Sequence, residues 1–134
     1  MKSFVAVAFT HKGKLILQRR DHDAPNNPGA LGFFGGLVEQ NEDADAAIRR
    51  EIEEETSLKA SDLEIKHLFD AEIPIREFGS EAGIDSVYEC ELSSREFIVK
   101  EGKGAEVYSL EELVGRKDVA PYSHVIIDKL VKRK

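Results

Sequence analysis

The sequence is poor in the residues that mark specialised protein classes. It contains no tryptophan, one methionine, four prolines and a single cysteine in 134 residues. A lone thiol cannot form an intrachain disulfide or build a zinc-thiolate cluster, so both kinds of site are excluded. Cys90 alternates with Tyr88 and Leu92 in a strand-like stretch, and this pattern favours a buried core thiol over a reactive one.

Long hydrophobic runs are also missing. The apolar run near the start, Phe4 to Phe9, is far too short to cross a membrane or to serve as the hydrophobic part of a signal peptide. No targeting signal is visible, so we expect a cytoplasmic protein without a membrane partner.

Basic residues are outnumbered by acidic ones, 19 Lys and Arg against 26 Asp and Glu, which gives a formal net charge of −7. An acidic surface repels the phosphate backbone of nucleic acids, so a nucleic-acid polymer is not the expected partner. Phosphorylated small molecules remain compatible with this charge, because divalent cations can mediate the contact.

The remaining features describe one compact domain over residues 1–134. Hydrophobic residues make up 41% of the chain and charged residues 34%, which is an ordinary composition for a globular protein. This length is enough for one domain with a core and too short for two. Strand-like and helix-like stretches do not alternate regularly, which predicts a mixed α/β domain.

The strands are expected where apolar residues cluster between turn signals. Gly13 supplies the positive φ that a hairpin turn needs. Loops are expected at residues 21–32 and 78–85, which are rich in turn-forming residues. The expected strands are, in chain order, residues 3–9, 15–17, 37–38, 63–75, 86–92 and 105–108.

Two helices are expected near the end of the chain. Ser109 followed three residues later by Glu112 predicts a capping box on a short helix. Pro121 suits the first turn of a last helix. The apolar stripe expected on that helix consists of Val125, Ile126, Leu130 and Val131.

Residues 43–56 contain neither glycine nor proline and predict a longer helix that starts at Asn41 or Glu42. When this helix is projected along its axis, Glu51 and Glu55 fall within its apolar stripe, and Glu54 falls at the edge of the stripe. A solvated acidic face is the ordinary explanation of such a charge run. Here, however, carboxylates would face the domain interior, where an unpaired charge costs several kcal/mol.

A cation is therefore expected beside these carboxylates. Glu51, Glu54 and Glu55 lie three and four residues apart, so they share one helical face. Mg²⁺, or Mn²⁺ in its place, prefers carboxylate and carbonyl oxygens. Gly35 and Gly36 precede the helix and let backbone carbonyls approach the same ion, because they carry no side chain.

Together these residues resemble a known signature. The order is Gly36, five residues, Glu42, seven residues, and then Arg50-Glu51-Ile52-x-Glu54-Glu55-x-Ser57-Leu58. It is similar to the Nudix box of hydrolases that act on nucleoside diphosphates linked to another moiety, and it spans residues 36–58. The resemblance implies an α/β/α sandwich around a mixed β-sheet, with the box as a loop-helix-loop.

The resemblance also implies a role for each box residue. Arg50 would orient a glutamate, although a surface ion pair that contributes little is the ordinary alternative. Glu42 would support the loop that starts at Gly36. Mutator-type members of the family add a glutamate from a late loop, and Glu101 is its best match here, as a metal ligand or a general base. The residues that would bind Mg²⁺ are Glu51, Glu54, Glu55, the carbonyl of Gly35, and Glu101.

In the mechanism that this arrangement suggests, Glu54 and Glu55 mainly hold the metal. Either Glu51 or Glu101 takes a proton from the attacking water. An exposed loop glutamate without a role is the ordinary alternative for Glu101.

Two positions depart from the family pattern. Ser57 stands where the family has a glycine that favours a left-handed conformation, so the turn after the helix is expected to be strained, at a cost of roughly 1 kcal/mol, or reshaped. Phe34 stands where many members have a proline, which affects the stiffness of the loop and not its chemistry.

Substrate contacts are less clearly marked. Arg19 and Arg20 end the second strand and are candidate phosphate contacts. Ser123 lies where mutator-type members carry an asparagine that reads an oxidised guanine, which argues against that substrate. Aromatic residues that could stack on a base, although such residues are more often part of a core, are Phe33, Phe34, Phe78 and Tyr122.

The function most consistent with the resemblance is Mg²⁺-dependent hydrolysis of a nucleoside triphosphate. Hydrolysis of ADP-ribose or a nucleotide sugar is the enzymatic alternative. A catalytically silent nucleotide-binding module is the non-enzymatic one, although this chain keeps the box glutamates. A purely structural acidic helix ranks last. Because many members dimerise, the resemblance also raises a homodimer as an expectation.

Overall fold

The computed structural model describes residues 2–25, 27–73 and 83–133. One mixed seven-stranded sheet has the order β3-β2-β1-β6-β5, with β4 added to β1 and β7 added to β2. β1 and β6 run parallel, and the other pairs are antiparallel. The strands are β1 (Lys2–His11), β2 (Lys14–Arg19), β3 (Leu31–Gly32), β4 (Phe34–Leu37), β5 (Lys66–Ile73), β6 (Gly83–Glu91) and β7 (Ala105–Tyr108).

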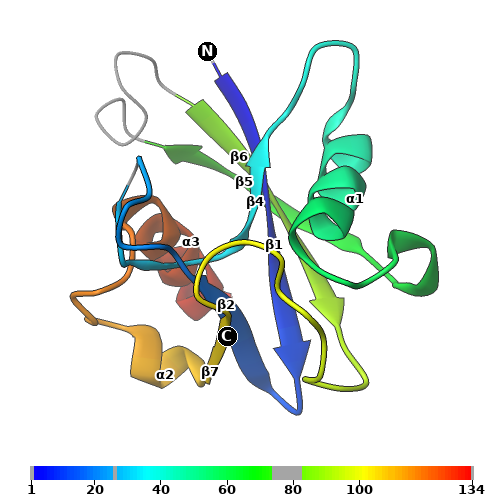
Figure 1. Ribbon diagram of the computed structural model, residues 1–134. Helices are drawn as coiled ribbons and strands as arrows, with labels where there is room; N and C mark the ends of the chain where they lie inside the picture. The colour runs from blue at the N-terminus through cyan, green and yellow to red at the C-terminus, as the bar shows by residue number, and fades with distance from the viewer. Residues whose placement is uncertain (1, 26, 74–82, 134) are drawn as a thin grey trace.

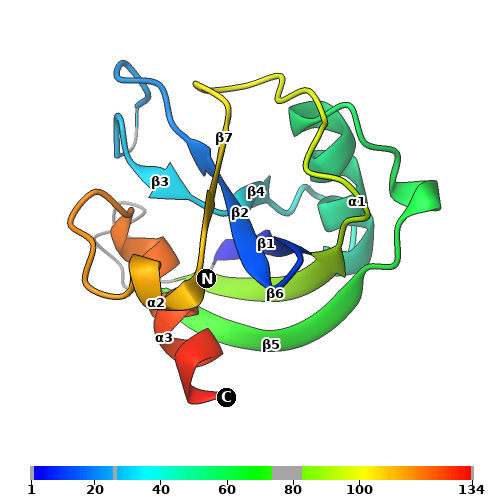
Figure 2. The ribbon, with the colours of Figure 1, turned by 90° about the horizontal axis from the view of Figure 1, so that it is seen from below.

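The helices cover both faces of this sheet. α1 (Ala44–Glu55) lies on one face, and α2 (Leu110–Leu113) and α3 (Pro121–Lys132) lie on the other (Figures 1 and 2). A short 3₁₀ turn, η1 (Ala60–Asp62), follows α1. This arrangement confirms the α/β/α sandwich around a mixed sheet. No helix in the described ranges is both long enough and apolar enough to span a membrane.

β1 belongs to the cores on both faces, because its residues are apolar at successive positions. Val5, Val7 and Phe9 pack into the cluster beneath α1. Ala6 and Ala8 point the opposite way, into the cluster beneath α2 and α3. Alternation of side chains along a strand explains why this one stretch can be apolar throughout.

The register of β1 positions the site. Its second half pairs with β2, from Phe9 to His11. Its first half pairs with β4, from Phe4 to Val7, so β2 and β4 lie on successive halves of β1. This pairing places Gly35 opposite Ala6 in the middle of the sheet.

The expected hairpin and capping box are confirmed. Lys12 and Gly13 have φ values of 50° and 79° in the turn between β1 and β2. Ser109 and Glu112 exchange the two capping hydrogen bonds, and Pro121 is in the first turn of α3. Cys90 is buried, and burial raises the pKa of its thiol to about 11, as expected for a core thiol.

Several expectations about element bounds are wrong. Residues 31–32, expected within a loop, form β3, and the strand expected at residues 37–38 is β4, which runs from Phe34 to Leu37. The helix cap is Asp43, whose side chain accepts a hydrogen bond from the backbone N–H of Ala46, so neither Asn41 nor Glu42 starts the helix. The strand expected over residues 63–75 begins only at Lys66, because η1 comes first. Within the loop expected at residues 78–85, residues 83–85 belong to β6, and residues 78–82 lie outside the described ranges, as do residues 74–75.

The apolar stripe expected on α3 is also partly wrong. Val131 is 40% exposed, whereas Ile126 and Ile127 are fully buried. The sheet-facing side of α3 runs through Ser123, Ile126, Ile127 and Leu130, and Val131 lies off this side.

Candidate active site

The box begins at two glycines that the packing requires. Gly35 has a φ of 156°, and a Cβ there would collide with the carbonyl oxygen of Val5. A Cβ on Gly36 would collide with the carboxylate of Glu51. The glycines therefore bring β4 against β1 and let the carboxylate of Glu51 lie over the backbone.

Glu55 is the most deeply buried carboxylate of the box. Only 6% of the residue is exposed, because α1 packs Ile48 and Ile52 against the sheet on the same face. One Glu55 oxygen accepts a hydrogen bond from the backbone N–H of Gly35, at 3.0 Å. Burial raises the pKa of Glu55 to about 9, and the nearby carboxylates of Glu51 and Glu101 raise it further in the same direction.

Glu51 and Glu54 lie one turn earlier and share contacts with Arg50. The Arg50 guanidinium donates to Glu54 at 2.7 Å and to Glu51 at 3.2 Å. Burial is the largest cause of a raised Glu51 pKa, about 7, and a hydrogen bond with Glu54 adds to it. Glu54 is more open, with 53% of its side chain exposed. Of the three glutamates expected on the inward face of the helix, Glu51 and Glu55 therefore point inward, and Glu54 lies at the edge of that face.

Arg50 connects these glutamates to the loop before the helix. Its guanidinium also donates to Glu42 at 2.6 Å and to the carbonyl of Leu37 at 3.0 Å. Glu42 in turn accepts a hydrogen bond from the backbone N–H of Glu39. The hydrogen bond from Arg50, followed by that from the backbone of Glu39, lowers the pKa of Glu42. Arg50 therefore ties the glycine loop to the helix, which suits a positioning residue.

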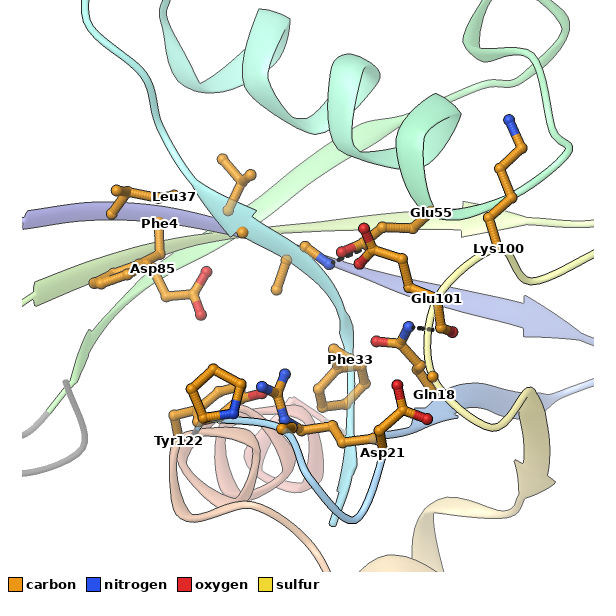
Figure 3. A pocket seen from close by; sticks show the side chains of 18 of the residues that line it. Phe4, Gln18, Asp21, Phe33, Leu37, Glu55, Asp85, Lys100, Glu101 and Tyr122 are labelled. Carbon is orange, nitrogen blue, oxygen red and sulfur yellow. Dashed lines mark hydrogen bonds between the residues drawn. The ribbon is translucent and has the colours of Figure 1, made fainter. Parts of the chain in front are cut away.

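The chain after α1 brings a distant loop to the site. Thr56 forms a β-bridge with Val99, and Lys100 donates its backbone N–H to the carbonyl of Glu55 at 2.7 Å. The next residue, Glu101, is held by its backbone carbonyl, which accepts a hydrogen bond from the Gln18 side chain at 2.8 Å. As a result, the side chains of Glu55 and Glu101 face each other (Figure 3).

The strain expected at Ser57 is absent. Ser57 is not among the described residues that have a positive φ. The helix ends in the extended residue Thr56 instead of a left-handed turn. Ser57 then donates its backbone N–H to the carbonyl of Ile98, and its hydroxyl accepts from the backbone N–H of Ile98 at 2.9 Å. The turn is therefore reshaped into a short strand-like pairing.

These residues open into a cleft of about 980 Å³ between the sheet, α1, the start of α3 and the loop after β2. Figure 3 shows two parts of this cleft: Glu55, Glu101 and Lys100 at one end, and Phe4, Asp85 and Tyr122 at the other. The cleft-lining residues that the sequence analysis singled out as site or aromatic candidates are Arg20, Phe33, Gly35, Gly36, Glu55, Glu101 and Tyr122.

Three expected substrate contacts lie elsewhere. The Arg19 guanidinium binds Glu106 at 2.8 Å and Asp118 at 3.1 Å, so it joins β2 to β7 and the chain before α3. Phe34 is fully buried and packs edge-on against Phe9 in the core, with ring centres 5.5 Å apart. Ser123 is fully buried, and its hydroxyl accepts from the backbone N–H of Phe33.

The sequence analysis missed Asp85, Gln18 and Lys100 as cleft residues. For Asp85 a signal existed, because it alternates with Val87 on the inward face of a strand whose other inward residues are apolar. Gln18 and Lys100 left no such signal. Their positions depend on the pairing of β2 with β7 and of Thr56 with Val99, which are distant in sequence.

The donor chemistry of the box suits a hard divalent cation. Glu55 offers a buried carboxylate and Glu51 a largely buried one, and the Glu51 carboxylate lies against the backbone of Gly36. Within the described ranges, no group of three or more His, Cys, Asp or Glu side chains already surrounds one point. Arg50 accounts for part of this, because it draws Glu54 toward itself.

A family model described as the NUDIX domain matches residues 1–130, and no curated protein matches the chain. A MutT protein from Methanosarcina mazei is similar in structure, with a TM-score of 0.83 and 18% identity over 98% of this chain and 94% of that one. The E. coli dihydroneopterin triphosphate pyrophosphohydrolase has a TM-score of 0.73 and 17% identity, over 98% and 96%. The NUDIX domain of Shewanella oneidensis NrtR, complexed with ADP ribose, has a TM-score of 0.74 and 15% identity, over 98% and 86%.

At these identities the solved structures show a shared fold and no shared substrate. The family model, by contrast, covers nearly the whole chain and includes every residue of the box. The chain therefore belongs to the Nudix family of pyrophosphohydrolases.

Proposed function

We propose that this chain hydrolyses a phosphoanhydride bond of a nucleoside triphosphate, with Mg²⁺ as the metal and Mn²⁺ as its substitute. The observation that carries the proposal is the buried carboxylate of Glu55, which faces Glu101 across the cleft and accepts a hydrogen bond from the backbone N–H of Gly35. Burial and the neighbouring carboxyl groups, that of Glu101 among them, raise the pKa of both Glu51 and Glu55 here. Such a cluster repels a bare polyphosphate and attracts a cation that can bridge the two.

Glu51, Glu54, Glu55 and the carbonyl of Gly35 would hold the metal. When bound, Mg²⁺ neutralises phosphate oxygens and lowers the pKa of a coordinated water. Glu101 or Glu51 accepts the proton of the water that attacks phosphorus. The bond from phosphorus to the bridging oxygen breaks, and the leaving phosphate or pyrophosphate carries away the electron pair.

Other cleft residues would position the substrate. Lys100 precedes Glu101, but its ammonium donates to the carbonyl of Glu53 at 3.1 Å and points away from Glu101 in Figure 3, so we assign it no phosphate contact. Arg20 lines the cleft and shares a hydrogen bond with Tyr122, so its guanidinium is a candidate phosphate contact within the cleft. We retain Arg20 and not Arg19 as the phosphate contact, because Glu106 and Asp118 bind Arg19.

An ADP-ribose substrate is the second candidate. The structurally similar NrtR domain was solved with ADP ribose, whereas the E. coli neighbour is a pyrophosphohydrolase of a triphosphate. A silent binding module is disfavoured by the intact set of box glutamates.

The test is a Mg²⁺-dependent assay on a panel of nucleoside triphosphates, ADP-ribose and nucleotide sugars, which scores the release of pyrophosphate, phosphate and monophosphate. We expect Glu54→Gln and Glu55→Gln to lower kcat by a factor of about 100 or more while the circular dichroism spectrum is retained. Glu53→Gln is the matched control, because Glu53 lies on the same helix and is exposed.

Undiminished hydrolysis by both Glu54→Gln and Glu55→Gln would refute the metal role of the box. Nucleotide binding without turnover on the whole panel would identify a silent module instead.

A further inference from the structure

Asp85 is buried at the end of the cleft opposite the box. It lies on β6 between Phe4 of β1 and Ala71 of β5 in the sheet register. Only 3% of the residue is exposed, and its side chain lines the cleft. Figure 3 shows its carboxylate directed into the open space, toward the side where Tyr122 lies.

This carboxylate lacks the partners that a buried charge needs. Its Oδ1 atom is the only buried side-chain oxygen or nitrogen of the described residues without a hydrogen-bond partner. Burial raises the pKa of Asp85 to about 7, and the neighbouring carboxylate of Asp70 adds to the effect. An apolar residue would suit the fold better at this position. The acceptor is therefore available to a group that enters from the cleft.

The surroundings of Asp85 suit a flat ring. Phe4 and Tyr122 line the same end of the cleft and Phe33 lies nearer its middle, and aromatic faces of this kind stack on planar heterocycles. The carboxylate end with Glu55 and Glu101 lies at the opposite end of the same cleft. A nucleotide with its phosphates at the glutamates would thus present the edge of its base to Asp85.

We propose that Asp85 selects the base of the substrate by accepting hydrogen bonds from a ring N–H and an adjacent amino group. This inference rests on the proposed function, since it assumes that the phosphates bind at the box. Guanine carries this double-donor edge, and so do pterin rings. Adenine offers one donor beside an acceptor, and uracil offers one N–H between two carbonyl oxygens, which a carboxylate repels.

Equilibrium binding of nucleoside diphosphates with Mg²⁺, measured by calorimetry, tests the selection directly. GDP and IDP differ only in the exocyclic amino group, so we expect wild type to bind GDP at least tenfold more tightly than IDP. ADP and UDP should bind more weakly than GDP. Equal affinity for GDP and IDP, or a preference for ADP or UDP, would overturn the proposal.

The variant Asp85→Asn separates recognition from structure. Asparagine offers one acceptor and one donor, which matches the edge of hypoxanthine or adenine better than that of guanine. We therefore expect weaker GDP binding and a smaller or inverted ratio of GDP to IDP affinity. Asp70→Asn is the control, because it removes a nearby charge on β5 that does not line the cleft. An equal loss for all four diphosphates in Asp85→Asn would assign Asp85 a structural role only.

Hydrolysis assays with GTP and ITP keep the two proposals distinct. Hydrolysis without discrimination between the guanine and hypoxanthine nucleotides would overturn the role of Asp85 and leave the proposed function standing. Discrimination in binding without any hydrolysis would support the role of Asp85 and overturn the proposed function. Comparison of GTP with dihydroneopterin triphosphate then identifies which source of the double-donor edge is preferred.

Discussion

At the scale of single residues, Arg50 shows how one cation organises several carboxylates. Its guanidinium contacts Glu42, Glu51, Glu54 and the carbonyl of Leu37. We expect Arg50→Ala to lower the free energy of unfolding by about 1–3 kcal/mol, because it leaves partly buried acceptors unpaired. Arg50→Lys should recover part of the loss, since lysine keeps the charge but lacks the planar fork. Urea titration measures both.

Arg49→Ala is the control for this change. Among the described residues, Arg49 pairs with the exposed Asp45 alone, at 3.3 Å, so its removal should cost less than about 0.5 kcal/mol. Equal losses for the Arg49 and Arg50 variants would contradict the assignment of Arg50 as the organising residue.

Glu101 is the residue whose catalytic role depends most on the rate measurement. Glu101→Gln keeps the size and the backbone hydrogen bond to Gln18 but removes the ability to accept a proton. If Glu101 takes the proton of the attacking water, kcat should fall by about 10²–10⁴-fold and the acidic limb of the pH–rate profile should change. An unchanged profile with unchanged kcat would remove Glu101 from the mechanism and leave Glu51 as the base.

Asp85 links the stability of the free protein to pH. Because burial raises its pKa from 3.8 to about 7, the folded state binds a proton more tightly than the unfolded state does. Stability from this group is therefore complete below pH 3.8 and is lost as the pH rises to about 7, by roughly 4 kcal/mol at most. Asp70 and the hydroxyl of Tyr122 are the other titratable groups near Asp85.

The expected outcome is a difference in stability between wild type and Asp85→Asn that grows as the pH rises. Asp85→Asn should unfold at about the same urea concentration as wild type near pH 4 and at a higher one near pH 8, because only wild type acquires a buried charge. Asp70→Asn is the reference for loss of an exposed charge. A difference between wild type and Asp85→Asn that does not vary with pH would show that Asp85 does not titrate in this range.

At the scale of elements, the pairing of the segment after α1 with residues 97–100 positions the late loop. The Ser57 hydroxyl accepts the backbone N–H of Ile98 at 2.9 Å, and the Thr56–Val99 bridge continues the pairing. We expect Ser57→Ala to lower stability by about 1 kcal/mol through loss of this hydrogen bond. Ser57→Gly should lower the stability by about 0.5 kcal/mol more, because glycine makes the unfolded chain more flexible.

Thermal unfolding measures these losses, and kcat reports whether the position of Glu101 changes with them. A stabilised Ser57→Gly variant would show that the family's left-handed turn is preferred after all. Such a result would contradict the extended conformation of Thr56 and the unstrained backbone at Ser57.

Local patterns were enough to predict most elements. Turn chemistry at Gly13, the capping box at Ser109 and the inward side of α1 are all properties of near neighbours in sequence, so the sequence alone predicted them. The inward placement of Glu55 followed from helical spacing alone. The wrong predictions concern element boundaries and helix faces that are set by packing. Examples are the cap of α1 at Asp43 and the buried Ile127 on α3.

Contacts between distant segments account for the other errors. Arg19 and Arg20 are adjacent in sequence, but only the pairing of β2 with β7 shows that Arg19 faces Glu106. Phe34 looked like a candidate for stacking until β4 was placed against β1, which buries its ring beside Phe9. A residue that lines a cleft through tertiary pairing, such as Gln18, leaves no periodic signal in the sequence.

At the scale of the whole molecule, the excess of acidic residues means that cation binding at the box should change the stability of the folded protein. The formal net charge is −7, and part of that charge is concentrated where Glu51, Glu55 and Glu101 meet. Screening by any salt should relieve the general repulsion a little. A homodimer and a cytoplasmic location remain predictions, and light scattering on the purified protein tests the first.

A cation that binds only the folded box should raise the melting temperature beyond this screening effect. Binding at a hundredfold excess over Kd stabilises a protein by about 2.7 kcal/mol, which corresponds to a shift of several degrees for a domain of this size. We expect MgCl₂ to raise the melting temperature of wild type and of Glu53→Gln more than KCl does at equal ionic strength. Glu55→Gln should respond equally to both salts, because Glu55 is the buried carboxylate of the cluster. Equal responses to both salts in wild type would mean that the carboxylates act only through the net charge and do not form a metal site.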